Sequence, residues 1–316
     1  MMQPARAPVV VGAAVAAALA LASAAASQEP SPSAAAPPSD ARYGGYLFRD
    51  ADGRPLPFQS DEAIESFLAS AEIVSSKPIP VGVTAPRKLT LEGDGVRAEA
   101  AFKTVDQEER NVRDRVGGRG RFYLVWRDWY GYDIAAYRVD RLLGLDRVPP
   151  VIERKWRRNT GSLQIWLAGV MAERDRQEQG LEPPDLIRWN QQRDILRIFD
   201  NLVANRDANL GNRLIDRNWR IWFIDCSRCF GNSTELLVPE AITHCDRGLW
   251  EALQNLDRER AELSLNQYLT KAEIDAMFIR RDKLVEHIRG LIDTWGEEMI
   301  IFDSPLPPTE VRPNGK

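Results

Sequence analysis

Short apolar runs recur through the first half of the chain, and their length is typical of β-strands. The runs occupy residues 88–92, 96–105, 121–126 and 162–167. The first two flank Gly93-Asp94-Gly95, a turn sequence that predicts a β-hairpin. We therefore expect a β-rich segment in this half of the chain.

A helical spacing of apolar residues appears once in the first half, at residues 134–145. Apolar side chains share one face there, and Gly144 with Pro149-Pro150 predicts where the helix ends. The residues on this face are Ala135, Val139, Leu142 and Leu143.

The second half is dominated by helical spacing. One helix is expected to end near Asn205, and segments 247–260 and 271–299 are also amphipathic. The apolar face of the first helix consists of Ile195, Ile198, Phe199 and Leu202. This order predicts an α+β protein with a β-rich N-lobe over about 43–168 and a helical C-lobe over about 169–300.

The first 27 residues carry one charge, Arg6, and then an apolar run that passes into alanine and serine. This order is typical of a secretory signal peptide, and an uncleaved membrane anchor is the alternative because the run is almost long enough to span a bilayer. Residues 28–42 are a Pro/Ser/Ala-rich linker, and residues 301–316 form a flexible tail. We expect an exported protein with no other membrane span, secreted or periplasmic, or lumenal if the host is eukaryotic.

The composition excludes several classes of function. The 316 residues contain 42 lysines and arginines against 46 aspartates and glutamates, so no strong positive field recruits nucleic acid. Three cysteines are too few for a disulfide-built scaffold. Two distant histidines disfavour a histidine-rich metal centre and a serine–histidine triad.

The stretch from 205 to 225 has the pattern of a catalytic loop followed by a hairpin. Arg206-Asp207 precedes Asn212 by the R-D-x-x-x-x-N spacing, and two short strands joined by a turn at 216–219 should bring Asn212 beside Asp225. An amide and a carboxylate oxygen suit Mg²⁺ or Mn²⁺, and Asp207 could accept a proton from an attacking hydroxyl. The structural alternative is that these are ordinary turn and cap residues.

The first half offers matching groups for nucleotide phosphates. Lys103 ends the strand Ala100-Ala101-Phe102-Lys103, and residues 80–84 begin a turn before the preceding strand, where a phosphate-covering loop belongs. Asp133 stands where the next helix should begin and is a candidate partner for the lysine. The alternatives are a solvated lysine and a helix N-cap aspartate.

Taken in order, these motifs resemble the secretory-pathway kinase family, which includes the Golgi casein kinase, the xylosylkinase and four-jointed. Type II phosphatidylinositol 4-kinases are more distant relatives of that family. The resemblance covers about residues 45–290. It implies a two-lobed, atypical protein-kinase-like fold with a β-rich N-lobe and a helical C-lobe.

The resemblance also implies a role for each residue in the site. Lys103 would hold the phosphates with Asp133 as its helix partner, and the strand containing Gln164 would lie under the adenine. Asp207 would be the catalytic base, and Asn212 and Asp225 would be the metal ligands.

The chain departs from the family pattern at three positions. The metal-binding motif reads Asp225-Cys226-Ser227, with no glycine after the aspartate. The helix partner is Asp133 rather than glutamate, one methylene shorter, and the 80–84 segment has a single glycine.

The cysteines and an arginine-rich run leave alternatives open. Cys226 and Cys229, with Cys245 further on, could form a disulfide, bind zinc with His244 or remain free buried thiols. Residues 110–121 contain five arginines and three glycines, which favours a solvated loop over a patch for anionic substrates.

Two classes of function remain. The first is an exported phosphotransferase that moves the γ-phosphoryl of ATP or GTP, with Mg²⁺ or Mn²⁺, to a hydroxyl of a protein, glycan or lipid headgroup. The second is a catalytically inactive kinase-fold protein that acts as a binding or scaffold module in the cell envelope, favoured by the scarcity of ATP in a bacterial periplasm. A coincidental motif spacing in a structural domain is a third, weaker alternative.

Overall fold

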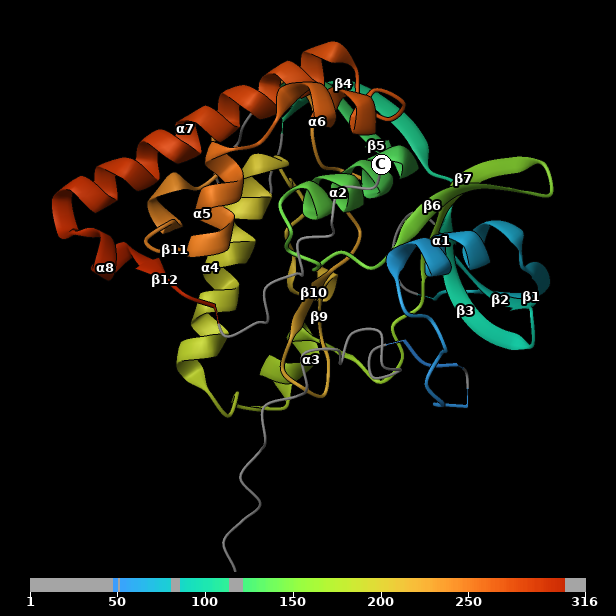
Figure 1. Ribbon diagram of the computed structural model, residues 1–316. Coiled ribbons are helices and arrows are strands. Elements are labelled where there is room, and N and C mark those ends of the chain that lie inside the picture. Colours follow the sequence, from blue (N-terminus) through green and yellow to red (C-terminus); the bar gives the residue numbers. More distant parts are fainter. Residues whose placement is uncertain (1–47, 51, 81–85, 114–121, 305–316) are drawn as a thin grey trace, which may run out of the picture. The chain divides into compact units, whose positions relative to one another are not determined.

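The computed structural model describes residues 48–50, 52–80, 86–113 and 122–304, all within one compact unit, Pro37–Lys316 (Figure 1). The predicted leader at 1–27, the linker at 28–42 and the tail from 305 lie outside the described residues. So do residues 81–84 of the expected phosphate-covering loop and residues 114–121 of the arginine-rich run.

A five-stranded antiparallel sheet forms the first half of this unit, in the order β1-β2-β3-β7-β6. Its strands are β1 (Glu72–Pro78), β2 (Arg87–Gly93), β3 (Val96–Lys103), β6 (Val151–Trp156) and β7 (Asn159–Ile165). The predicted hairpin is confirmed, because Asp94 and Gly95 join β2 to β3 with φ of 50° and 73°. Two consecutive left-handed residues are what a tight two-residue hairpin turn requires.

The two faces of the sheet have different neighbours. Helix α1 (Asp61–Ser70) lies against one face and contributes Ile64 and Leu68 to a buried apolar cluster with strand residues (Figure 1). The strand residues in this cluster include Leu89, Leu91, Ala98, Ala100, Phe102, Leu163 and Ile165. Because side chains alternate along a strand, Lys103 and Gln164 belong to the opposite face.

A separate pair of antiparallel strands, β4 (Asp106–Arg113) and β5 (Phe122–Trp129), follows the lysine strand along the chain and precedes helix α2 (Tyr130–Leu142). Strand β5 and helix α2 confirm the predicted strand and helix. The expectation of a loop from residue 110 is wrong for Arg110–Arg113, which pair with β5. The sequence of β4 is DQEERNVR, which lacks the apolar alternation that would predict a strand.

Helices dominate the second half, as predicted. They are α3 (Glu173–Glu178), α4 (Leu186–Leu202), α5 (Arg247–Gln254), α6 (Arg258–Leu265), α7 (Lys271–Trp295) and α8 (Glu297–Ile300), with 3₁₀ turns at Leu210–Asn212 and Pro239–Ala241. Three short strands, β8 (Met171–Ala172), β9 (Arg213–Ile215) and β10 (Ile221–Phe223), form a small sheet, and β11 (Cys245–Asp246) pairs in parallel with β12 (Ile301–Phe302).

Caps divide the expected long helices. The prediction of one helix over 247–260 is wrong, because Asp257 accepts a hydrogen bond from the Arg260 amide and starts a new helix, α6. The helix expected over 271–299 ends at Gly296, whose φ is 88°. At its start, Thr270 and Glu273 form a capping box.

The fold is α+β, with a sheet-rich N-terminal part and a helical C-terminal part. Two buried apolar clusters correspond to these parts, and Trp222 of β10 joins the cluster of the large sheet. Helix α2 packs with the helices of the second cluster. Among the described residues, no helix has the length and apolar character needed to cross a bilayer.

Candidate functional site

Lys103, at the end of β3, lies between two carboxylates that come from distant parts of the chain. Its Nζ is 2.7 Å from Oδ2 of Asp133 on α2 and 2.9 Å from Oδ1 of Asp225, which follows β10. The lysine side chain is 9% exposed and that of Asp133 is 3% exposed. Lys103 is therefore not a solvated strand-end lysine but a buried ammonium at the centre of an ion triad, in which Asp133 is buried and Asp225 is 33% exposed.

Asp133 of helix α2 contacts strand β3, strand β7 and the segment after β10. It sits in the first turn of α2, whose N-cap is Trp129, so the N-cap interpretation of Asp133 is wrong. Its Oδ1 accepts a hydrogen bond from the Cys226 amide at 2.8 Å, and its Oδ2 accepts one from Ser162 Oγ at 3.3 Å. The shorter aspartate thus reaches the lysine while also holding the segment that carries Asp225.

Burial and charge act in opposite directions within this triad. Burial raises the pKa of Asp133, and the Lys103 ammonium offsets only part of that effect. At Asp225 the Lys103 charge is the larger influence and lowers the pKa of the carboxyl. Burial opposes the charge of Lys103, but the two carboxylates outweigh it and raise the pKa of the ammonium. At neutral pH, Lys103 is a fixed positive charge and Asp225 a fixed negative one.

The predicted hairpin is formed, and it brings Asn212 beside the segment of Asp225. Strands β9 and β10 pair antiparallel, and the Ile224 amide donates to the Asn212 carbonyl oxygen at 3.2 Å. Asn212 is anchored by its Nδ2, which donates to the Asp207 carbonyl oxygen at 3.0 Å. Asp225 has a φ of 62°, a left-handed backbone that is costly for a residue with a side chain and that clusters at functional sites.

These two residues fit a hard divalent cation. Within the described part of the chain, Asn212 Oδ1 and Asp225 Oδ2 have no hydrogen-bond or ion-pair partner, so both oxygens are available. No group of three or more histidine, cysteine, aspartate or glutamate side chains that could hold a metal occurs among the described residues. A metal held by these two side chains would keep open coordination positions, as is usual for Mg²⁺.

Asp207 lies in the loop between α4 and β9, and its carbonyl oxygen accepts the hydrogen bond from Asn212. Its Oδ2 is 3.0 Å from Arg228 Nη1, and its Oδ1 accepts a hydrogen bond from Asn209 Nδ2 at 2.9 Å. The neighbouring Arg206 is buried, and its Nη2 donates to the Phe230 carbonyl oxygen at 2.8 Å. The loop is therefore tied to the segment after Asp225 at two points.

Gln164 lies within β7, opposite Ala101 of β3 and on the same sheet face as Lys103. Its side chain is buried, and Nε2 donates to the Pro149 carbonyl oxygen at 3.3 Å. This contact holds the strand to the segment before β6.

Several polar residues beside the predicted site were not evident from the sequence. Arg228 was part of a C-x-x-C segment that suggests sulfur chemistry, and Asp128 lies near the end of β5, beyond the apolar run that predicts this strand. Ser162 reaches Asp133 only through strand pairing. The one signal in the sequence was the position of Arg228, three residues after the candidate metal ligand.

The three cysteines are free and buried. Of the alternatives considered above, the structure therefore has buried thiols rather than a disulfide. Burial and the neighbouring Cys226 raise the pKa of the Cys229 thiol, which disfavours the thiolate needed for zinc binding or exchange.

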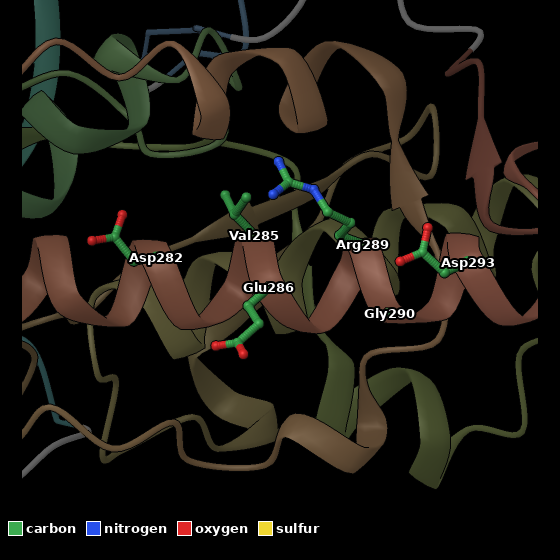
Figure 2. Close-up of a pocket in the computed structure, with 6 residues that line it drawn as sticks. All are labelled: Asp282, Val285, Glu286, Arg289, Gly290 and Asp293. Atoms are coloured by element: carbon green, nitrogen blue, oxygen red, sulfur yellow. The ribbon is translucent and has the colours of Figure 1, made fainter.

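A cavity of about 460 Å³ lies elsewhere, along helix α7. Its described lining residues all belong to that helix: Asp282, Val285, Glu286, Arg289, Gly290 and Asp293. Figure 2 shows Val285 and Arg289 pointing to one side of the helix and Glu286 to the other. None of the residues of the lysine and aspartate cluster lines it.

Solved structures with a similar fold include a Fam20 protein and the Golgi casein kinase. The chain matches a hydra Fam20 structure with sugar at a TM-score of 0.58 and 16% identity, covering 78% of this chain and 94% of that one. It matches the Golgi casein kinase at a TM-score of 0.55 and 16% identity (79% of this chain and 80% of that one). A Golgi casein kinase structure with Mn/ADP bound matches at 0.54 and 16% (79% and 81%).

No family model and no curated protein matches the sequence. At 16% identity the structural likeness establishes the fold. The resemblance to secretory-pathway kinases that the motifs indicated is confirmed at that level, and the fold is the two-lobed kinase-like fold that the sequence predicts.

Proposed function

We propose that this protein is a metal-dependent phosphotransferase that moves the γ-phosphoryl group of a nucleotide to a hydroxyl acceptor. One observation carries the proposal: Lys103 contacts both Asp133 and Asp225 on a kinase-like fold. A lysine paired with a helix carboxylate, beside a second carboxylate with a free oxygen, is the arrangement that phosphoryl transfer needs.

In this function Lys103 binds the nucleotide phosphates, and Asp133 keeps its ammonium in place. Asn212 and Asp225 hold Mg²⁺ or Mn²⁺, which neutralises charge on the phosphates when bound. ATP and GTP both fit this requirement, because the groups named here contact phosphates rather than the base. A structural neighbour with Mn/ADP bound supports the choice of nucleotide and metal.

Gln164 contributes to the nucleotide site as a positioning residue in β7. It holds the strand to the Pro149 carbonyl and faces the same side of the sheet as Lys103. The segment that follows β7 would lie beside the nucleotide base.

Asp207 acts as the general base. Its carboxylate lies in the loop that also orients Asn212, since the Asn212 amide donates to the Asp207 carbonyl oxygen at 3.0 Å. A proton from an acceptor hydroxyl would move to a carboxylate oxygen of Asp207 as the hydroxyl oxygen attacks phosphorus. The acceptor belongs to a protein, a glycan or a lipid headgroup, and the protein works in an exported or lumenal compartment.

The test is transfer of labelled γ-phosphoryl from ATP or GTP, with Mg²⁺ or Mn²⁺, to the hydroxyls of protein, glycan and lipid acceptors and to water. General-base catalysis contributes about 10²–10⁴-fold, so Asp207→Ala should lower the rate by that factor without lowering the melting temperature markedly. Asp293→Asn, an exposed aspartate on α7, is the matched control and should transfer at the wild-type rate.

Two results would count against the proposal. Wild-type transfer by Asp207→Ala removes the base assignment. Nucleotide binding by the wild type without any transfer favours the binding or scaffold function instead.

A further inference from the structure

Arg228 connects the candidate base to the segment that carries the metal ligand. It lies three residues after Asp225, and its Nη1 is 3.0 Å from Asp207 Oδ2. Its Nε is 2.7 Å from Asp128 Oδ2. One guanidinium therefore bridges two carboxylates from different parts of the fold.

Asp128 holds the guanidinium through its Nε. The Asp128 side chain is 7% exposed, and a buried carboxylate is costly unless it is paired, so the contact with Arg228 is strongly constrained. The backbone adds a second tie, because the Trp129 amide donates to the Ser227 carbonyl oxygen at 2.8 Å. The end of the β4–β5 hairpin thus holds the residue before Arg228 as well as its side chain.

The contacts of Asp207 leave its carboxylate little rotational freedom. Arg228 donates to Oδ2, and Asn209 donates to Oδ1 at 2.9 Å. Each carboxylate oxygen can accept more than one hydrogen bond, so an acceptor hydroxyl still finds a free lone pair. The direction of that lone pair is set by the two donors.

We propose that Arg228 is a positioning residue for the base, held in turn by Asp128. This inference rests on the proposed function. Arg228 and Asp225 belong to one short segment, so Arg228 fixes the position of the base Asp207 relative to the metal ligand Asp225. A rigid, planar guanidinium suits this role better than an ammonium, because two of its nitrogens can serve the two carboxylates at once.

The position of Arg228 determines which kinetic quantity should change. Among the described residues its ion pairs are with Asp207 and Asp128, and neither of these is assigned to contact the nucleotide phosphates. Loss of the guanidinium should therefore misplace the base and lower kcat, while the KM for nucleotide stays the same. An error of about 1 Å in placement can cost about 10²-fold in rate.

The experiment compares Arg228→Gln, Arg228→Lys and Asp128→Asn with the wild type, in the full protein. We expect Arg228→Gln to lower kcat about 10- to 100-fold, with nucleotide KM within about twofold and an unchanged melting shift by nucleotide and metal. Arg228→Lys should recover part of the rate, and Asp128→Asn should lose less than Arg228→Gln. Arg289→Gln, on the exposed face of α7, is the control for loss of an arginine.

A double variant tests whether Arg228 acts through the base. In the Asp207→Asn background, Arg228→Gln should change the residual rate by less than about twofold, because residues that act as a unit are not additive. Equal losses in both backgrounds overturn the inference, as does a raised nucleotide KM with unchanged kcat. Absence of transfer by the wild type overturns the proposed function and this inference together, whereas an active wild type with an equally active Arg228→Gln overturns the inference alone.

Discussion

Lys103 is the residue on which the rest of the site depends, because two carboxylates approach its single ammonium. Like charges in a buried position repel, and burial penalises each of them. With Lys103 in place, the Asp225 carboxyl has a lowered pKa and Asp133 remains paired. The lysine therefore has a structural role in addition to its proposed contact with phosphate.

Replacing Lys103 by methionine should destabilise the protein by about 3–5 kcal/mol, the usual cost of leaving a buried charge without its partner. The measurement is urea denaturation at pH 7. The control is Lys271→Met, because Lys271 pairs with Asp275 at 3.0 Å but is 81% exposed, and such a surface pair contributes about 1 kcal/mol or less. Equal losses in the two variants would contradict the buried triad.

At the residue scale, the sequence predicted the groups that carry chemistry better than the groups that hold them. Asp207, Asn212 and Asp225 follow from local spacing and a hairpin, which are properties of one short stretch. Arg228 contacts Asp128, which lies 100 residues earlier in the sequence, and no local sequence pattern predicts that contact. Contacts of this kind depend on the packing of the β4–β5 hairpin against the loop.

At the scale of the elements, strand β7 packs closely against the lysine strand β3 at Gly161. Ser162 pairs with Lys103, and a Cβ added at the adjacent Gly161 would overlap the Lys103 carbonyl oxygen. The β3 backbone would have to move to make room, and Lys103 with it.

Gly161→Ala should therefore lower both the stability and the nucleotide affinity, because the shift of β3 moves the ammonium. Gly290→Ala on α7 is the matched control, since a Cβ there meets nothing within 4 Å. That control should stabilise the helix by about 0.5–1 kcal/mol. Thermal melting with and without nucleotide measures both effects, and a harmless Gly161→Ala would refute the close packing.

Helix α2 contains a buried carboxylate that makes stability depend on pH. Burial raises the pKa of Asp140 to about 6, although Arg141 beside it partly offsets this effect. The pKa of Asp140 is higher in the folded state than in the unfolded state. The stabilisation that protonated Asp140 contributes to folding is therefore fully present below about pH 4 and is lost as the pH rises through 6.

Asp140→Asn should remove this pH-dependent part of the free energy of unfolding, which changes by an amount on the order of 2–3 kcal/mol between pH 4 and pH 7. The measurement is the free energy of unfolding of both proteins over that range. Their difference should change with pH, and a constant difference would show that Asp140 titrates normally in the folded protein.

Several of the elements that escaped prediction have few apolar positions or short spans, although β1 and β6 were also not predicted. Strand β4 is a charged run, and β8, β11 and β12 have two residues each. Helix α1 also lies outside the predicted elements, although Ser60 accepts from the Ala63 amide and Ile64, Phe67 and Leu68 share a face. Its signal was present, but it is brief and follows a proline-containing stretch.

In the molecule as a whole, the site exists only because the two parts of the kinase-like unit meet. Lys103 comes from the sheet-rich part and Asp133 from helix α2, which packs with the helical part. Asp207, Asn212 and Asp225 come from the helical part. Trp222 also crosses this division, since its ring contacts Phe48 at 6.1 Å between centroids. The sequence predicted this architecture, because the lysine strand lies in the β-rich first half of the chain and the 205–225 stretch lies in the helical second half.

The most direct test of the account is the thermal shift of the purified protein with ATP or GTP, each with Mg²⁺ or Mn²⁺. A ligand at 100 times its Kd stabilises the folded state by about 2.7 kcal/mol, which is readily measured. We predict a shift that needs both nucleotide and metal, that Asp225→Asn abolishes and that Asp293→Asn leaves intact. The absence of a shift with every pairing, or an equal shift in Asp225→Asn, would contradict the nucleotide and metal site at Lys103 and Asp225.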